Sequence, residues 1–123
     1  MKVFGFLMMV ITMSFGSINV NAQTSVKEVR NVDVAEASVL ATNPEVVVLD
    51  VRTAREFASG KIDGAVNIPL NTVTNKAEGL DKSKKYLVYC RSGVRSRRAA
   101  MILARKGFEV YNLKGGILAW NRR

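Results

Sequence analysis

Two short apolar runs constrain the fold of this 123-residue chain more than any other feature. The segments Val46–Asp50 and Lys85–Cys90 each contain four consecutive apolar or aromatic residues, without the alternation of a half-exposed strand. Such runs are typical of strands that are buried on both faces in a parallel sheet. Open α/β folds bind ligands beyond the carboxyl ends of these strands. The sequence therefore predicts a buried parallel sheet with Cys90 at its ligand-binding edge.

Helical patterns separate the strands along the chain. Two of them begin with a polar capping residue followed three positions later by glutamate, at Asp33–Glu36 and Thr53–Glu56. The longest helix is expected from Ser96 to Lys106, with Gly107 as its C-cap. Further strands are expected at 26–32, 64–69 and 108–113, and shorter helical segments at 71–80 and 117–121. This alternation predicts an α/β sandwich around a mostly parallel sheet.

The first 22 residues have the pattern of an export signal. Lys2 precedes an apolar stretch, and a more polar stretch then leads to the small residue Ala22. The alternative is a membrane anchor, but the apolar core is shorter than the ~20 residues that a spanning helix needs. We therefore expect residues 1–22 to be a cleaved signal peptide and residues 23–123 to be a single domain. The mature protein is then exported, to the periplasm, and meets the membrane only as its export route.

The composition excludes several kinds of site. The chain has no His, which rules out a Ser-His-Asp triad, a Cys-His dyad and any metal bound through imidazole. It has one Cys, which rules out an internal disulfide and disfavours structural zinc. We therefore expect neither a metal nor a cofactor. In an oxidising compartment, a single unpaired thiol is either inert or functional.

The residues after Cys90 favour the functional alternative. The segment Arg91-Ser-Gly-Val-Arg95 can curl as a tight loop around Gly93, and a helix is expected to start about six residues after Cys90. Backbone N–H groups and a helix N-terminus stabilise an anion, so the pKa of the thiol should fall below its free value of ~8.5. We therefore predict that Cys90 is a nucleophile, rather than a buried Cys that merely ends a strand. The predicted anion-binding loop consists of Arg91, Ser92, Gly93, Val94 and Arg95.

Other motifs follow one another at ordinary spacing on both sides of this loop. They are Leu49-Asp-Val-Arg52, Glu56-Phe57, Gly60-Lys-Ile-Asp-Gly-Ala-Val-Asn-Ile-Pro69, Val88-Tyr-Cys-Arg-Ser-Gly-Val-Arg95, and Gly115-Gly116 with Trp120. Together they resemble the rhodanese family over Val32 to Trp120. The resemblance implies a five-stranded, mostly parallel sheet flanked by helices on both faces. It also implies transfer of sulfane sulfur through a persulfide on Cys90, with the loop Arg91 to Arg95 binding the substrate and the persulfide. With an export signal, the chain resembles the small periplasmic thiosulfate sulfurtransferases of the phage-shock type.

This resemblance implies a reaction with an anionic donor. The Cys90 thiolate would attack the outer sulfur of thiosulfate, and sulfite would leave. A thiophilic acceptor, cyanide in an assay or a protein thiol in the cell, would then take the sulfur. Many family members have a His where this chain has Lys61. Because Lys61 lies outside the Cys loop, we expect no chemical step to depend on it.

The charged residues near the two strand ends have more than one interpretation. Arg91 either draws in the anion or is a solvated surface charge, and Arg95 either binds the anion or forms an internal ion pair. Asp50 and Arg52 end the Val46–Leu49 strand; they either support the site as scaffold or serve only in capping and surface pairing, and the second is favoured. Glu56 is expected to be the partner of an Arg, and Trp120 to pack at the core or its rim.

The charge distribution favours a small anionic substrate. The formal net charge is +9, and the segment from Lys82 to Phe108 contains nine Lys or Arg and no Asp or Glu. A field of one sign near a cleft increases the encounter rate of anions. Nucleic acid is the rival partner for so basic a chain, but the export signal and the lack of an aromatic-basic platform argue against it.

Three rival functions use the same residues. One is a persulfide carrier or redox partner without turnover, which the sequence does not separate from an enzyme. Another is a Cys-based phosphatase or arsenate reductase. The related dual-specificity phosphatases have five residues between Cys and Arg, whereas four separate Cys90 from Arg95, and the tighter loop suits a sulfur atom better than a phosphate. The last is an inactive binding module, against which the intact Cys90 argues.

Overall fold

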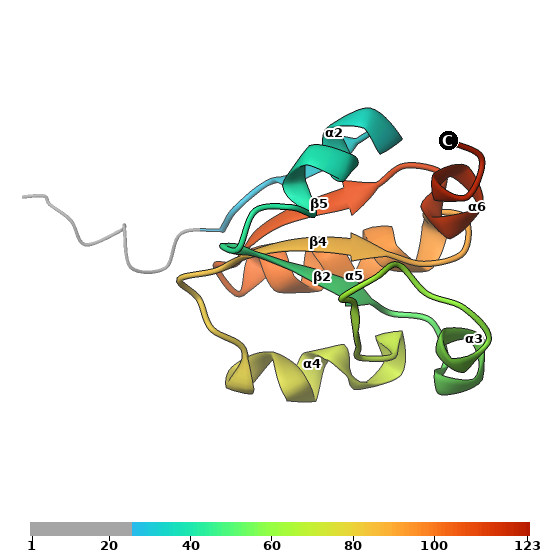
Figure 1. The fold of residues 1–123 in the computed structure, drawn as a ribbon. Helices are drawn as coiled ribbons and strands as arrows, with labels where there is room; N and C mark the ends of the chain where they lie inside the picture. Colours follow the sequence, from blue (N-terminus) through green and yellow to red (C-terminus); the bar gives the residue numbers. More distant parts are fainter. Residues whose placement is uncertain (1–25) are drawn as a thin grey trace, which may run out of the picture.

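Residues 26–123, described by a computed structural model, form a five-stranded sheet in which every pair of neighbouring strands is parallel (Figure 1). The strand order is β1-β5-β4-β2-β3. The strands are β1 (Val29–Val32), β2 (Val46–Asp50), β3 (Val66–Asn67), β4 (Lys85–Tyr89) and β5 (Glu109–Leu113). This arrangement confirms the predicted parallel sheet with β1 at its edge. The predicted signal peptide lies outside the described residues.

Helices cover both faces of the sheet, as predicted. They are α2 (Val34–Leu40), α3 (Ala54–Ala58), α4 (Val73–Lys76), α5 (Val94–Arg105) and α6 (Gly116–Trp120), and short 3-10 turns flank α4 at Leu70–Thr72 and Ala77–Gly79. The buried residues of α4 and α5 belong to one core cluster, and those of α2 and α6 belong to another on the opposite face. Within residues 26–123, no helix is long and apolar enough to cross a membrane.

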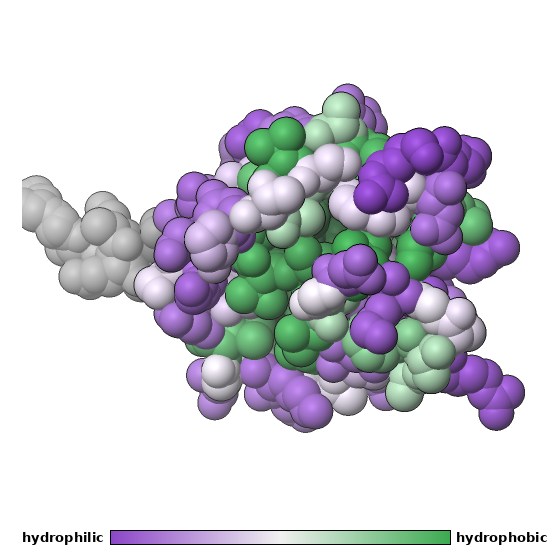
Figure 2. Space-filling view, viewed as in Figure 1, coloured by the Kyte–Doolittle hydropathy of each residue, from purple (hydrophilic) through white to green (hydrophobic). Residues whose placement is uncertain are grey.

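The alternation of side chains along β4 supplies both halves of the core. Tyr86 and Val88 pack on the α5 side, with Tyr86 edge-to-face against Phe108 at 5.6 Å between ring centroids. Leu87 and Tyr89 pack on the α2 side. Because both faces of β4 are buried, its sequence reads as a continuous apolar run. Figure 2 shows apolar surface at the centre of the face seen in Figure 1, surrounded by polar surface.

The capping residues explain most of the helix boundaries. Asp33 accepts a hydrogen bond from the N–H of Glu36, and Thr53 and Glu56 form a complete capping box at the start of α3. The predicted reciprocal bond at α2 does not form, because the Glu36 carboxylate accepts a hydrogen bond from Arg30 at 3.0 Å instead. Trp120 packs against the second core cluster, as predicted.

The start of α5 differs from the prediction. The helix begins at Val94, two residues before the expected Ser96, and Gly93 is its N-cap in the left-handed conformation, with φ of 108°. No side chain caps this end of the helix, so its first residue cannot be found from a polar capping residue in the sequence. The connecting loop is therefore only Arg91 to Gly93, and Arg95 belongs to the first turn of the helix rather than to the loop.

Candidate active site

Cys90 lies directly beyond the carboxyl end of β4, where α3 and α6 flank the strand end (Figure 1). Cys90 is 1% exposed and belongs to the core cluster on the α5 side. The N–H of Gly93 donates a hydrogen bond to Sγ at 3.1 Å. The thiol is thus nearly enclosed by the loop that connects β4 to α5. This is the position predicted for Cys90, and its chemical role stays a prediction.

The surroundings of the thiol favour its charged form. Burial raises the pKa of Cys90, because a thiolate is poorly solvated in the core. Hydrogen bonds from the Ser96 hydroxyl and from the backbone N–H groups of Ser96, Gly93 and Ser92 lower it, and together they outweigh burial. The pKa of Cys90 is therefore lowered from its ordinary value, in the direction that the loop predicted.

Two glycines allow the backbone to close around Cys90. At Gly93, the positive φ turns the N–H toward the sulfur, a conformation that side chains disfavour. At Gly116, the start of α6 packs so closely that an added methyl group would overlap the carbonyls of Cys90 and Arg91. The next two residues of α6 donate their N–H groups to these same carbonyls, Ile117 to Cys90 at 2.9 Å and Leu118 to Arg91 at 3.2 Å. Helix α6 therefore holds the base of the loop.

A chain of polar side chains lies behind the thiol, and no local sequence pattern predicted it. The Ser96 hydroxyl donates to Oδ1 of Asn112 at 2.6 Å, and Nδ2 of Asn112 donates to Asn31 at 2.9 Å. Ser96 and Asn112 are both buried. The signal available in the sequence was a single Asn inside the otherwise apolar strand at 108–113. A buried amide needs partners, and here they run from Asn31 in the edge strand β1 to Ser96 in the first turn of α5.

Arg95 forms the internal ion pair that was one of its two predicted roles. Its guanidinium donates to both carboxylate oxygens of Glu56, at 2.8 and 2.9 Å, and so joins α5 to α3. The hydrogen bond from Arg95 is the main reason that the pKa of Glu56 is lowered to about 2; bonds from Thr53 add to it, and partial burial opposes it. Glu56 is therefore the partner of an Arg, as expected.

Asp50 and Arg52 also pair, but the predicted surface location is wrong. Asp50 is fully buried and Arg52 is 5% exposed, with 2.7 Å between the guanidinium and the carboxylate. The hydrogen bond to Asp50 raises the pKa of Arg52. The guanidinium also donates to the carbonyl of Gly60 at 2.6 Å, and the Asn67 amide donates to the carbonyls of Asp50 and Arg52. Through these hydrogen bonds, the buried pair joins β2 to β3 and to the segment after α3.

The basic segment surrounds Cys90 in sequence but not in space. Lys82, Lys84 and Lys85 precede or open β4, about 16 Å of strand away from Cys90. Arg105 and Lys106 lie at the far end of α5, a helix about 18 Å long. The remaining four basic residues lie near the loop: Arg91, Arg95, Arg97 and Arg98. The expected field around the site is therefore weaker than the sequence suggested.

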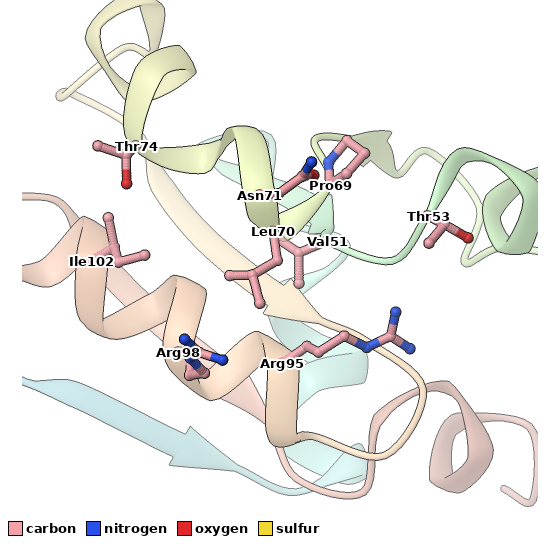
Figure 3. A pocket seen from close by; sticks show the side chains of 9 residues that line it. All are labelled: Val51, Thr53, Pro69, Leu70, Asn71, Thr74, Arg95, Arg98 and Ile102. Atoms are coloured by element: carbon pink, nitrogen blue, oxygen red, sulfur yellow. The ribbon is translucent and has the colours of Figure 1, made fainter.

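Two cavities lie on either side of the Arg95–Glu56 pair. One, of about 490 Å³, has Arg95 and Arg98 beside an apolar lining that includes Val51, Leu70 and Ile102 (Figure 3). The other, of about 380 Å³, lies between α3 and α6 and is lined by residues that include Arg91 and Lys61. Lys61, which lies outside the Cys90 loop in sequence, thus lines the same cavity as Arg91, the residue next to Cys90.

The described residues offer nothing that would hold a metal ion. Within 26–123, no three Asp, Glu or Cys side chains gather closely enough to coordinate one. Among the described residues, the ion pairs near the loop are Asp50–Arg52 and Glu56–Arg95, and Cys90 is a free cysteine. The arrangement therefore suits nucleophilic chemistry by the thiol of Cys90 with backbone N–H groups as its stabilising partners.

Comparisons with known proteins agree with this arrangement. Residues 33–123 match the family model described as the rhodanese-like domain. A protein named "Sulfurtransferase" from Allochromatium vinosum is 38% identical over 84 residues, which is 68% of this chain and 78% of that protein. The crystal structure of a rhodanese-related protein from Thermoplasma volcanium is similar with a TM-score of 0.71 and 32% identity, over 76% of this chain and 91% of that one.

A second solved structure has the same fold. The rhodanese-like domain protein from Staphylococcus aureus is similar with a TM-score of 0.66 and 31% identity, over 74% of this chain and 90% of that one. The family match includes β2, β4, the Cys90 loop and every helix from α2 to α6. The chain therefore belongs to the family of rhodanese-like domain proteins.

Proposed function

We propose that this protein is a sulfurtransferase that carries sulfane sulfur from thiosulfate, through a persulfide on Cys90, to a thiophilic acceptor. The observation that supports it most is the Cys90 thiol, nearly enclosed by backbone N–H groups that lower its pKa. Membership of the rhodanese-like family and the similarity to a named sulfurtransferase support the same reaction class.

The reaction proceeds in two displacements at sulfur. The Cys90 thiolate attacks the outer sulfur of thiosulfate, a new S–S bond forms, and the donor's own S–S bond breaks with its electron pair leaving on sulfite. The loop N–H groups stabilise the negative charge on the persulfide. A cyanide ion or a protein thiolate then attacks the outer sulfur of the persulfide and releases the Cys90 thiolate. With an ionised thiol, the first step needs no general base, which suits a chain without His.

The ion pairs position the loop rather than react. Arg95 and Glu56 join α5 to α3, while Arg52 and Asp50 fix the segment that faces the loop from β2. Arg95 is therefore not free to hold the oxygens of a phosphate, and only four residues separate it from Cys90. These two facts argue against the phosphatase alternative.

Intact-mass measurement after addition of thiosulfate tests the proposal. We expect a gain of one sulfur atom on the wild-type protein, its removal by cyanide with release of thiocyanate, and no gain on Cys90→Ser. Circular dichroism should show that this variant keeps its fold, because Ser replaces one buried atom. No gain of sulfur in the wild type would reject thiosulfate as donor. Persulfide formation without repeated turnover, with both cyanide and a protein thiol offered, would show a carrier instead.

The proposed setting is outside the cytoplasm. We propose that residues 1–22 are removed on export and that the mature chain, starting at Gln23, meets a small anionic donor and a protein thiol in the periplasm. The apolar stretch after Lys2 supports this. The mass of the protein recovered from a bacterial periplasmic fraction should correspond to residues 23–123, and full-length protein retained in the cytoplasm would contradict it.

A further inference from the structure

A groove runs between α5 and the edge strand β1, starting at the Cys90 loop. Its first part, a cavity of about 770 Å³, is lined at one end by Ser92 and Gly93 of that loop. Its second part, a cavity of about 360 Å³, reaches Arg105 at the end of α5. In Figure 1 this helix lies behind the sheet. The two parts adjoin because three residues line both of them: Asn31, Arg97 and Met101.

Exposed apolar side chains line the groove on its α5 side. Val94 and Met101 are seven residues apart in the helix, so they lie on the same helical face. They are 70% and 40% exposed, and both line the larger cavity. Apolar side chains that gather beside a cavity mark a contact surface, and methionine adapts its shape to a partner. The groove therefore offers apolar contact area that solvent covers in the free protein.

The charge of the groove is strongly positive. Its lining contains one carboxylate, that of Glu28. It also contains five basic side chains: Lys27, Arg97, Arg98, Arg105 and Lys114. All five are exposed, and among residues 26–123 none of them lies within salt-bridge distance of a carboxylate. A molecule that complements this surface therefore carries several negative charges.

A segment of polypeptide fits the groove better than a membrane or a nucleic acid. A lipid surface is flat and would meet a projecting face, whereas these charges border a hollow. Single-stranded nucleic acid stacks its bases on aromatic side chains, and no aromatic residue lines either cavity. An extended segment of about six residues spans ~20 Å, close to the ~18 Å length of α5. Acidic and apolar residues in such a segment would meet the basic side chains and the pair Val94 and Met101.

We propose that this groove docks an acidic, partly apolar segment of the protein whose thiol takes the sulfur from Cys90. The identity of that protein as the sulfur acceptor rests on the proposed function, whereas the docking of an acidic segment does not. Cys90 lines neither part of the groove, so the docked segment and the thiol are different parts of the partner. The groove ends at Gly93, whose N–H donates to the sulfur of Cys90, so docking concentrates the partner's thiol near the loop.

The groove acts on the encounter and not on the bonds that form and break. The partner's thiolate attacks the outer sulfur of the persulfide, a new S–S bond forms, and the old one breaks with its electron pair returning to Cys90. Cyanide takes the sulfur in the same way, but it is too small to reach the groove at the same time. Substitutions at the far end of the groove should therefore slow transfer to a docking partner and leave transfer to cyanide as it is.

Two synthetic peptides and two double variants test the docking. In the acidic peptide, Glu and Leu alternate over about six residues, and a Gly-Ser linker joins them to one Cys. In the neutral peptide, Gln replaces every Glu. The groove variant is Met101→Ser with Arg105→Gln. Its matched control is Val39→Ser with Lys76→Gln, which removes an exposed apolar side chain and one exposed positive charge from α2 and α4.

At low ionic strength, the wild-type persulfide should react about tenfold faster with the acidic peptide than with the neutral one. The groove variant should lose about threefold to tenfold of the rate with the acidic peptide, and the matched control should lose none. All three proteins should form the persulfide from thiosulfate and lose it to cyanide at equal rates. A fluorescent acidic peptide with Ser in place of Cys measures binding without sulfur transfer, and its dissociation constant should rise by the same factor in the groove variant.

The outcomes separate the docking groove from the proposed function. If the fluorescent peptide binds with this pattern but thiosulfate never places sulfur on Cys90, the groove stands and the proposed donor is wrong. If transfer from thiosulfate to cyanide is normal but the groove variant and its control lose peptide binding equally, net charge alone attracts the peptide and the groove is overturned. Vesicles of phosphatidylglycerol and phosphatidylcholine replace the peptide in a last measurement. Loss of vesicle binding in the groove variant alone, with peptide binding intact, would assign the groove to a membrane and overturn the proposal as well.

Discussion

The Cys90 thiol is subject to two opposing effects, and the balance between them decides whether it reacts. Burial alone would make it an inert core residue, because a thiolate loses its solvation there. Four hydrogen-bond donors from the loop and the first turn of α5 reverse this, and one of them is the Ser96 hydroxyl. That hydroxyl has a single proton, and in the resting structure Asn112 accepts it at 2.6 Å.

Ser96→Ala should raise the pKa of Cys90, because it removes a donor to the thiolate while burial remains. At neutral pH, we expect alkylation by iodoacetamide to slow by roughly threefold to tenfold, which corresponds to the net loss of one hydrogen bond of about 0.5–1.5 kcal/mol. Asn112→Leu is the matched control. It removes the competing acceptor and frees the Ser96 proton for the sulfur, so the pKa of Cys90 should not rise. The measurement is the alkylation rate from pH 5 to 10, and equal shifts in the two variants would mean that both act only through packing.

At the scale of elements, the Arg95–Glu56 pair joins α3 to α5 across the mouth of the loop. Helix α3 has no buried residue, so this pair is a main link between it and the rest of the fold. The pKa of Glu56 is about 2 in the folded protein, below its ordinary value of 4.5. The pair therefore contributes stability that is present above pH 4.5 and is lost as the pH falls toward 2.

Glu56→Gln should reduce the free energy of unfolding at pH 7 by about 1–2 kcal/mol, after allowance for the partial exposure of the pair. The difference from wild type should shrink as the pH falls from 4.5 and should be nearly gone by pH 2, where about half of the wild-type carboxylate is also neutral. Urea unfolding at a series of pH values measures this. Glu36→Gln removes the exposed Arg30–Glu36 pair and should have almost no effect. A difference for Glu56→Gln that persists at pH 2 would assign the loss to the capping box instead.

The sequence predicted the elements well because each has a local cause. The apolar runs of β2 and β4, the Thr53 capping box and Gly107 at the end of α5 all depend on residues close in the chain. It misplaced the start of α5, since Gly93 caps this helix through its backbone conformation and not through a side chain.

The site was predictable only in part. Cys90 and its loop lie within one segment, so their arrangement could be inferred from spacing. The Ser96–Asn112–Asn31 chain joins residues 16 and 81 positions apart, and the cavity shared by Lys61 and Arg91 depends on how α3 and α6 pack. Such contacts have no local pattern, because tertiary packing alone brings these side chains together.

The length of the loop is an element-scale property that can be tested directly. Only three residues connect Cys90 to α5, and they aim the Gly93 N–H at the sulfur. Insertion of one Gly between Ser92 and Gly93 should re-aim these N–H groups around a larger space. We expect the rate of persulfide formation to fall by about tenfold or more. Loss of one complete oxyanion-hole donor typically lowers a rate by about a hundredfold or more. Thermal unfolding should change little, because the insertion is in an exposed loop. Unchanged thiosulfate kinetics would show that loop size does not set the chemistry.

At the scale of the whole molecule, positive charge is spread over both ends of the sheet. The formal net charge is +9, yet Lys82, Lys84, Arg105 and Lys106 lie at the end away from Cys90. Arg97 and Arg98 are exposed in the first turns of α5, near the loop. At 0.1 M ionic strength, screening limits the reach of an exposed charge to about 10 Å. The charges at the two ends should therefore contribute very differently to the attraction of an anion.

Salt should slow the reaction of Cys90 with thiosulfate far more than its alkylation by neutral iodoacetamide. The loop N–H groups act on the thiolate at contact distance and resist screening, whereas attraction of the dianion acts over several ångströms. Between about 0.02 and 0.5 M salt, we expect the thiosulfate rate to fall by roughly tenfold and the iodoacetamide rate by less than twofold.

The double variant Arg97→Gln with Arg98→Gln should reduce this salt dependence. The double variant Lys82→Gln with Lys84→Gln, which removes the same charge at the distant end, should not. If both pairs reduced it equally, the net charge and not its position would control the encounter. A thiosulfate rate that did not respond to salt would leave the positive charge without a role in binding the donor.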